Sequence, residues 1–106
     1  MAADPLLVER LRALLADEPS LEEKRMFGGV GFMVEGALAI AAMGGGGLLA
    51  RVGREAAGEL IGPRVEQMVM QDRVMTGWLR VSPAALDDEA LALWVRRCVQ
   101  FVRTLD

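Results

Sequence analysis

The sequence predicts an α+β fold, in which an antiparallel sheet is flanked by helices that cover mainly one of its faces. Apolar residues recur at helical spacing near both ends of the chain and once in between, and short apolar runs fill the rest of the interior. The links between successive runs have hairpin length, which favours antiparallel strands. The predicted order is α-β-β-β-β-α-β-β-α, in a single domain over residues 1–106.

The first predicted helix begins at Pro5. Proline costs little at the first helical position, and Asp4 before it is a good N-cap. Pro19 ends the helix, because proline disfavours helical geometry in the residue before it. The apolar stripe of this helix is Leu7, Val8, Leu11, Leu14 and Leu15.

Four strands are predicted between residues 22 and 53, because the apolar runs there are too short and too often interrupted for helices. Glu35-Gly36 is predicted to form a tight hairpin turn, since glycine tolerates positive φ. The glycines at 44–47 provide a flexible connection to the last of the four. The predicted strands cover residues 23–27, 30–35, 37–43 and 48–52.

A short helix is predicted over residues 54–61 and ends at Gly62-Pro63. Two further strands are predicted at 68–71 and 77–82, with a turn around Asp72-Arg73 between them. The apolar side of the short helix is Ala56, Ala57, Leu60 and Ile61.

The last predicted helix has the most regular pattern. Either Asp87 or Asp88 is its N-cap, and the acidic start that continues to Glu89 suits the positive end of the helix dipole. Its apolar stripe is Leu91, Trp94, Val95, Cys98, Val102 and Leu105.

The charge balance disfavours direct binding of nucleic acid. Twelve basic and fifteen acidic residues give a net charge of −3, whereas phosphate neutralisation usually requires a basic surface. A local patch of Lys24, Arg25, Arg51 and Arg80 remains an alternative route to nucleic acid.

The chain contains one cysteine and no histidine. A single cysteine excludes an internal disulfide and a thiolate zinc cluster, and the lack of histidine removes the commonest general base and metal ligand. We therefore predict no catalytic, metal-binding or cofactor-binding residue, no cofactor and no enzymatic activity. Cys98 is expected to be a structural residue, because it lies on the apolar stripe of the last helix.

Neither a targeting segment nor a membrane span is evident. Residues 1–5 lack the basic and apolar regions of a signal peptide, and no apolar stretch reaches the ~18 residues that a membrane span needs. We expect a cytoplasmic protein that does not bind a membrane.

The sequence is compatible with more than one role for the methionines and for Trp78. Six methionines beyond Met1 fall in or beside predicted strands, where core packing is favoured over an adaptable binding surface. On its strand, Trp78 shares a face with Arg80, whereas Leu79 and Val81 share the other. If Leu79 and Val81 face the helices, Trp78 lies on the opposite face of the sheet. Three roles for Trp78 then remain as alternatives: core packing, an interface with a partner, and contact with a ligand.

Three segments carry a family resemblance: residues 24–29 (KRMFGG), residues 49–52 (LARV) and residues 75–81 (MTGWLRV). Together and in this order they resemble the TfoX (Sxy) N-terminal-domain family of bacterial proteins. The resemblance implies an α+β domain with a secretion-chaperone-like fold. Full-length members are regulators of natural competence that act with other transcription machinery and carry a further C-terminal domain. This chain ends at Asp106 without one, so it resembles the stand-alone single-domain members.

These observations predict a non-enzymatic protein-interaction domain, with a transcription-regulatory or competence-related adaptor as its specific form. The partner is expected to be a protein, and pairing of sheet edges could also form a homodimer. The alternatives are a nucleic-acid-binding domain and a small-ligand-binding protein or enzyme without a recognisable motif. The candidate interaction surface is Lys24, Arg25, Phe27, Gly28, Gly29, Arg51, Trp78 and Arg80.

Overall fold

The computed structural model of the protein describes residues 3–26 and 28–105, so the predicted contribution of Phe27 lies outside the described residues. The α+β fold and the predicted order of elements are confirmed, with one additional 3₁₀ turn, η1. The elements are α1 (Pro5–Leu15), β1 (Leu21–Met26), β2 (Gly29–Val34), β3 (Ala37–Ala42), β4 (Leu48–Arg51), α2 (Arg54–Leu60), β5 (Val65–Met70), β6 (Arg73–Val81), η1 (Pro83–Ala85) and α3 (Asp88–Val102).

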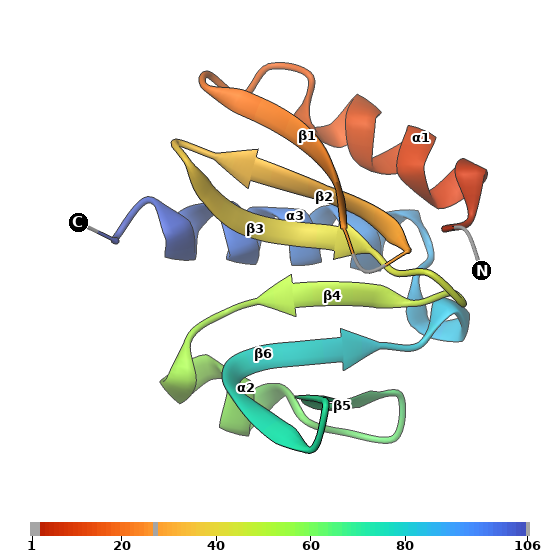
Figure 1. Ribbon diagram of the computed structural model, residues 1–106, viewed down its shortest axis with the longest axis vertical. Coiled ribbons are helices and arrows are strands. Elements are labelled where there is room, and N and C mark those ends of the chain that lie inside the picture. The colour runs from red at the N-terminus through yellow and green to blue at the C-terminus, as the bar shows by residue number, and fades with distance from the viewer. Residues whose placement is uncertain (1–2, 27, 106) are drawn as a thin grey trace.

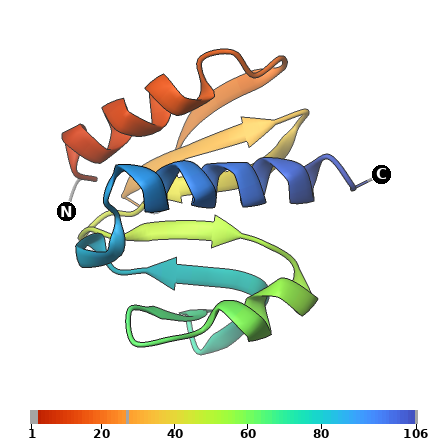
Figure 2. The ribbon, with the colours of Figure 1, turned by 180° about the vertical axis from the view of Figure 1, so that it is seen from behind.

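The six strands form one sheet in the order β1-β2-β3-β4-β6-β5, and every neighbouring pair is antiparallel. Strands that follow one another in the chain are neighbours in the sheet, except where α2 and β5 intervene and β6 pairs with β4. All three helices lie on one face, with α3 running across the middle of the sheet (Figure 2). No helix of the described residues lies over the opposite face (Figure 1).

Local signals place the ends of the two long helices. The Asp4 carboxylate accepts a hydrogen bond from the Leu6 amide at 3.0 Å, and the Asp87 carboxylate accepts one from the Ala90 amide at 2.8 Å. Each aspartate therefore pairs an amide that has no partner within its own helix. The predicted N-cap of α1 is confirmed, and Asp87 is the N-cap of α3.

The main core lies between the helices and the sheet. Leu11 of α1, Phe32 of β2, Leu79 of β6 and Cys98 of α3 are each fully buried there. The prediction that Leu79 and Val81 face the helices is confirmed, because both belong to this core. Phe32 and Ile40 contribute from neighbouring strands, so the helix face of the sheet is apolar across its centre.

Three residues predicted for the apolar stripes are instead exposed. Leu14 is 43% exposed because it lines an open groove between α1 and α3, together with Leu91. Ile61 and Leu105 are 50% and 40% exposed. Both follow the last helical residue of their segment, so the helical spacing no longer turns them toward the core.

The β5–β6 hairpin is longer than predicted. β5 begins three residues before position 68, and β6 begins at Arg73 instead of Gly77. Gln71 and Asp72 form the turn with φ values of 51° and 64°, the left-handed geometry that a two-residue hairpin requires. Among the described residues, none of the helices combines the length and apolarity that crossing a bilayer demands.

Candidate functional site

The face of the sheet opposite the helices carries its own group of apolar side chains. We call this surface the open face (Figure 1). It is drawn from β3, β4, β5 and β6 and from the loop after β3. Its apolar residues are Leu38, Ala41, Met43, Leu49, Met68, Met70, Met75 and Trp78.

The centre of the open face is buried even though no described helix or strand packs on it. Ala41, Leu49 and Met68 are only 3%, 1% and 5% exposed, because longer neighbouring side chains lie across them. Those longer side chains, including Met75 and Trp78, stay partly exposed. Exposed apolar patches on soluble domains are typical of sites that bind another molecule.

Four of the methionines belong to the open face: Met43, Met68, Met70 and Met75. The prediction of core packing is confirmed for Met68, which is 5% exposed within this smaller buried cluster. The other three pack against the cluster and stay partly exposed. A methionine surface can adjust its shape, because the side chain is unbranched and its thioether is polarisable.

Arg51 lies against two aromatic rings at one end of this face. Its guanidinium carbon is 5.0 Å from the ring centroid of Trp78 and 5.7 Å from that of Phe101 in α3. Its Nη1 also donates a hydrogen bond to the carbonyl oxygen of Leu38 at 3.4 Å. These contacts hold the Trp78 indole in place, since the faces of both rings attract the cation.

Gly77 sets the backbone that presents Trp78. Its carbonyl oxygen accepts hydrogen bonds from the amides of Val52 and Gly53, at 2.9 and 3.1 Å. Its φ is +89°, and a Cβ atom there would lie 3.2 to 3.3 Å from the backbone of Gly53 and Arg54. Only glycine fits both requirements, which explains its place directly before the tryptophan.

Gln67 stabilises the irregular pairing of β5 with β6, and sequence reasoning did not identify it. The register of the two strands shifts between Gln67 and Val69. The Gln67 side-chain amide donates to the carbonyl oxygens of Met75 at 2.7 Å and Trp78 at 3.2 Å. A side chain thus satisfies carbonyl groups that the regular ladder leaves free.

The structure divides the candidate surface between the two faces of the sheet. Arg51, Trp78 and Arg80 lie on the open face, and Lys24 shares this face because it pairs with Gly31, which pairs with Ala41. Arg25 pairs with Val30 and lies on the helix side. Gly28 and Gly29 are at the turn into β2. The patch proposed as an alternative route to nucleic acid is divided too, because Arg25 lies on the helix side and its other three residues lie on the open face.

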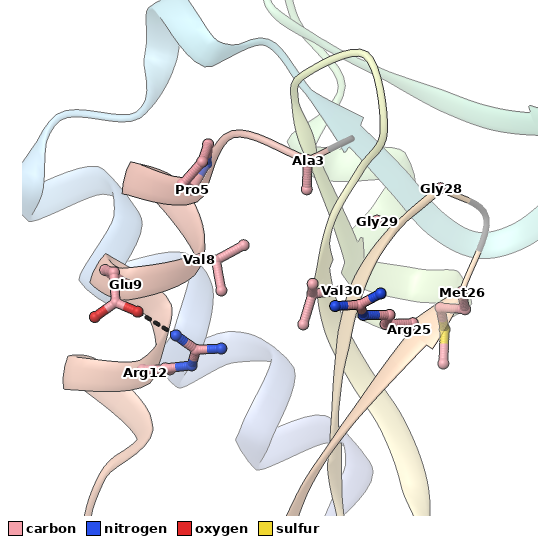
Figure 3. Close-up of a pocket in the computed structure, with 10 residues that line it drawn as sticks. All are labelled: Ala3, Pro5, Val8, Glu9, Arg12, Arg25, Met26, Gly28, Gly29 and Val30. Atoms are coloured by element: carbon pink, nitrogen blue, oxygen red, sulfur yellow. Dashed lines mark hydrogen bonds and ion pairs between the residues drawn. The ribbon is translucent and has the colours of Figure 1, made fainter. Parts of the chain in front are cut away.

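A cleft of about 490 Å³ separates α1 from the β1–β2 turn (Figure 3). Arg12 is paired with Glu9 and makes two hydrogen bonds, at 2.9 and 3.0 Å, to the carboxylate of Glu23. The hydrogen bonds that Arg12 donates to the carboxylates of Glu23 and Glu9 raise the pKa of its guanidinium. Arg25 projects into the cleft from the strand side (Figure 3). The cleft is wide and mixes both signs of charge, so it shows no preference for one class of ligand.

Packing accounts for Gly29 in the KRMFGG segment. A Cβ atom at this position would lie 2.0 Å from the carbonyl oxygen of Ala42 on β3. Two strands approach here more closely than any side chain allows. Gly29 therefore has a structural role beside the cleft.

The titratable groups do not converge on a reactive site within the described residues. No group of three or more Asp, Glu, His or Cys side chains is placed there to hold a metal ion. Cys98 is fully buried, and burial raises the pKa of its thiol to about 12. The thiol is therefore held in its neutral, unreactive form.

Sequence reasoning missed Leu38, Ala41 and Leu49 as parts of the open face. A signal for them is present, since residues 37–42 (ALAIAA) are apolar at every position. A strand with alternating apolar and polar residues has one face exposed to solvent. A strand that is apolar throughout contacts apolar groups on both faces of the sheet.

A family model described as the TfoX N-terminal domain matches residues 13–102, from the second half of α1 to the end of α3. The match includes every residue of the open face. Neither the curated proteins nor the solved structures contain a match to the chain.

Proposed function

Because the chain belongs to the TfoX N-terminal domain family, we propose that it is a non-enzymatic regulatory domain that binds another protein through its open face. Membership of this family suggests a regulatory or competence-related role. We place that role in the bacterial cytoplasm, as an adaptor in the control of transcription.

The observation that carries this proposal is the apolar character of the uncovered sheet face. A solvated face of an antiparallel sheet normally alternates to polar side chains. Here the corresponding positions hold Leu38, Met75 and Trp78, which surround the buried centre of the open face. Protein interfaces have the same composition, with an apolar core enriched in methionine, tryptophan and arginine.

A protein partner is favoured over nucleic acid, because the basic side chains point to different faces of the sheet or already donate hydrogen bonds within the chain. Lys24 and Arg25 are adjacent in β1 and point to opposite faces of the sheet. Arg51 and Arg80 donate hydrogen bonds to the carbonyl oxygens of Leu38 and Gly46. The net charge of the chain is −3, and its described cations do not form a continuous basic track for a phosphate backbone.

A binding role is favoured over catalysis for two reasons. The chain has no histidine, so proton transfer near neutral pH has no obvious carrier. Its one cysteine is enclosed in the main core, away from the open face.

Two neighbouring residues of β6 provide a matched test. Met75 packs in the open face, whereas Val74 pairs with Val69 on the other side of the hairpin and is 64% exposed. We expect Met75→Glu to abolish capture of native protein partners on an affinity resin, and Val74→Glu to retain it. Circular dichroism checks that both variants fold. A folded Met75→Glu protein that captures the same partners as the wild type would contradict the proposal.

A further inference from the structure

One row of residues crosses the whole open face, one residue from each strand. Successive members are directly paired, so their side chains all project from the same side of the sheet. In sheet order the row is Lys24, Gly31, Ala41, Leu49, Arg80 and Glu66.

The ends of this row suit a second copy of the chain. They carry opposite charges, with Lys24 on edge strand β1 and Glu66 on edge strand β5, and both are exposed. Between them, Gly31, Ala41 and Leu49 are buried under side chains of their own chain. A partner therefore meets the charged ends of the row and the partly exposed side chains, such as Met75 and Trp78, that pack over its centre.

We propose that the open face binds a second copy of this chain, in a face-to-face dimer whose two-fold axis runs parallel to the strands. This inference rests on the proposed function, because it names the partner of the same surface. The axis places β1 of one protomer over β5 of its partner. Lys24 then faces the partner's Glu66, and the partly exposed side chains over the centre of each open face, such as Met75 and Trp78, form the contact between the two sheets.

Charge decides between this axis and the alternative one. A two-fold axis across the strands would place each strand over the same strand of the partner. Lys24 would then face its own copy, as would Glu66, and like charges opposed across an interface are unfavourable. Only the axis parallel to the strands gives two attractive pairs.

The charges of the β1 edge disfavour edge pairing through that strand. β1 carries Glu22, Glu23, Lys24 and Arg25 in succession, and a charged edge strand resists the addition of another strand. The faces of two sheets, in contrast, pack about 10 Å apart when both are apolar, as in a β-sandwich.

The expected affinity is modest. With strands spaced about 4.8 Å apart and about 3.3 Å per residue, six strands of six residues give a flat footprint of about 24 by 20 Å. Two such footprints amount to about 1,000 Å², the lower end of the range for specific interfaces. The measurements therefore need protein concentrations from about 5 to about 500 µM.

The test is a charge exchange followed by sedimentation equilibrium at low salt. Lys24→Glu and Glu66→Lys are each expected to raise the dimer Kd roughly tenfold, because each creates two repulsive contacts. The double variant should return to within about threefold of the wild type, since both pairs are restored in reverse. An equimolar mixture of the two single variants should dimerise as the wild type does.

Three results would overturn the dimer. A wild-type chain that stays monomeric over the whole concentration range excludes it. Single variants that dimerise as well as the wild type exclude the axis parallel to the strands. A dimer that is equally stable with Met75→Glu excludes the open face as its interface. If a monomeric chain still captures other proteins in a manner that depends on Met75, the proposed function stands and only the identity of the partner fails.

Discussion

The guanidinium of Arg51 lies over the indole of Trp78, 5.0 Å from its ring centroid. The two residues come from separate segments of the family resemblance, 49–52 and 75–81, and they are paired directly across β4 and β6. Phe101 of α3 lies on Arg51 as well, at 5.7 Å. The arginine thus links the open face to the helix that covers the other side of the sheet.

Removing this arginine should weaken the fold. Arg51→Ala loses two cation–ring contacts and the packing of the side-chain stem, and we expect the free energy of unfolding to fall by about 1–2 kcal/mol. Urea denaturation measures the change. Arg54→Ala is the matched control, because Arg54 is exposed at the start of α2 and should alter stability by less than about 0.5 kcal/mol. Equal losses in the two variants would show that the stacking contributes nothing.

Two glycine variants should change stability in opposite directions. Gly29→Ala brings a Cβ atom to 2.0 Å from the backbone of Ala42, which cannot move aside as a flexible side chain can. We expect a loss of about 3 kcal/mol or failure to fold. Gly58→Ala meets nothing within 4 Å and lies inside α2, so it should stabilise the protein by about 0.5–1 kcal/mol. Thermal unfolding of both variants provides the measurement, and a Gly29→Ala protein as stable as the wild type would contradict the close approach.

Trp94 should be a major contributor to the main core. It is 5% exposed, and Trp94→Ala is expected to cost about 3–5 kcal/mol of unfolding free energy. Leu93, the neighbouring residue, is 41% exposed, so Leu93→Ala should cost less than about 1 kcal/mol. Chemical denaturation compares the two, and a cost below about 1 kcal/mol for Trp94→Ala would contradict the packing of α3.

Cys98 should make the fold less stable in alkaline solution. Burial raises the pKa of its thiol from 9.0 to about 12, so between these pH values the unfolded chain releases a proton that the folded chain retains. Stability is then fully present below about pH 9 and falls as the pH rises toward about 12.

The measurement is the urea midpoint of the wild type and of Cys98→Ala from about pH 8 to about pH 11. The variant starts from a lower stability because of the cavity, and it should lose less on alkalinisation. The chain has no tyrosine or histidine, which leaves few other groups to titrate in this range. Parallel pH profiles for the two proteins would contradict the role of the thiol.

The helices could be predicted well because their signals are local. Asp4 and Asp87 reach amides two and three residues away, and the stripe of α3 follows from its spacing alone. The exceptions were at helix ends and grooves, such as Leu14 and Leu105. Burial at those positions depends on what packs against the helix, which spacing does not specify.

The candidate site could be predicted only in part. Residue alternation placed Trp78 and Arg80 on the side away from the main core, and this is where they lie. The same alternation separates Lys24 from Arg25, although both belong to one short segment. Phe101 and Gln67 could not be found in this way, because their contacts join residues far apart in the chain or fill an irregular pairing.

By itself, the sequence determined the fold class, the order of the elements and the N-cap of α1, which depend on periodicity and on contacts within a few residues. Three separate segments carried the resemblance to the TfoX N-terminal-domain family, to which the chain belongs. The tertiary structure alone decided that four methionines gather on the open face, and that Lys24 and Glu66 end one row across six strands. That row depends on five successive registers, and a shift of one residue in any of them would turn every later side chain to the other face.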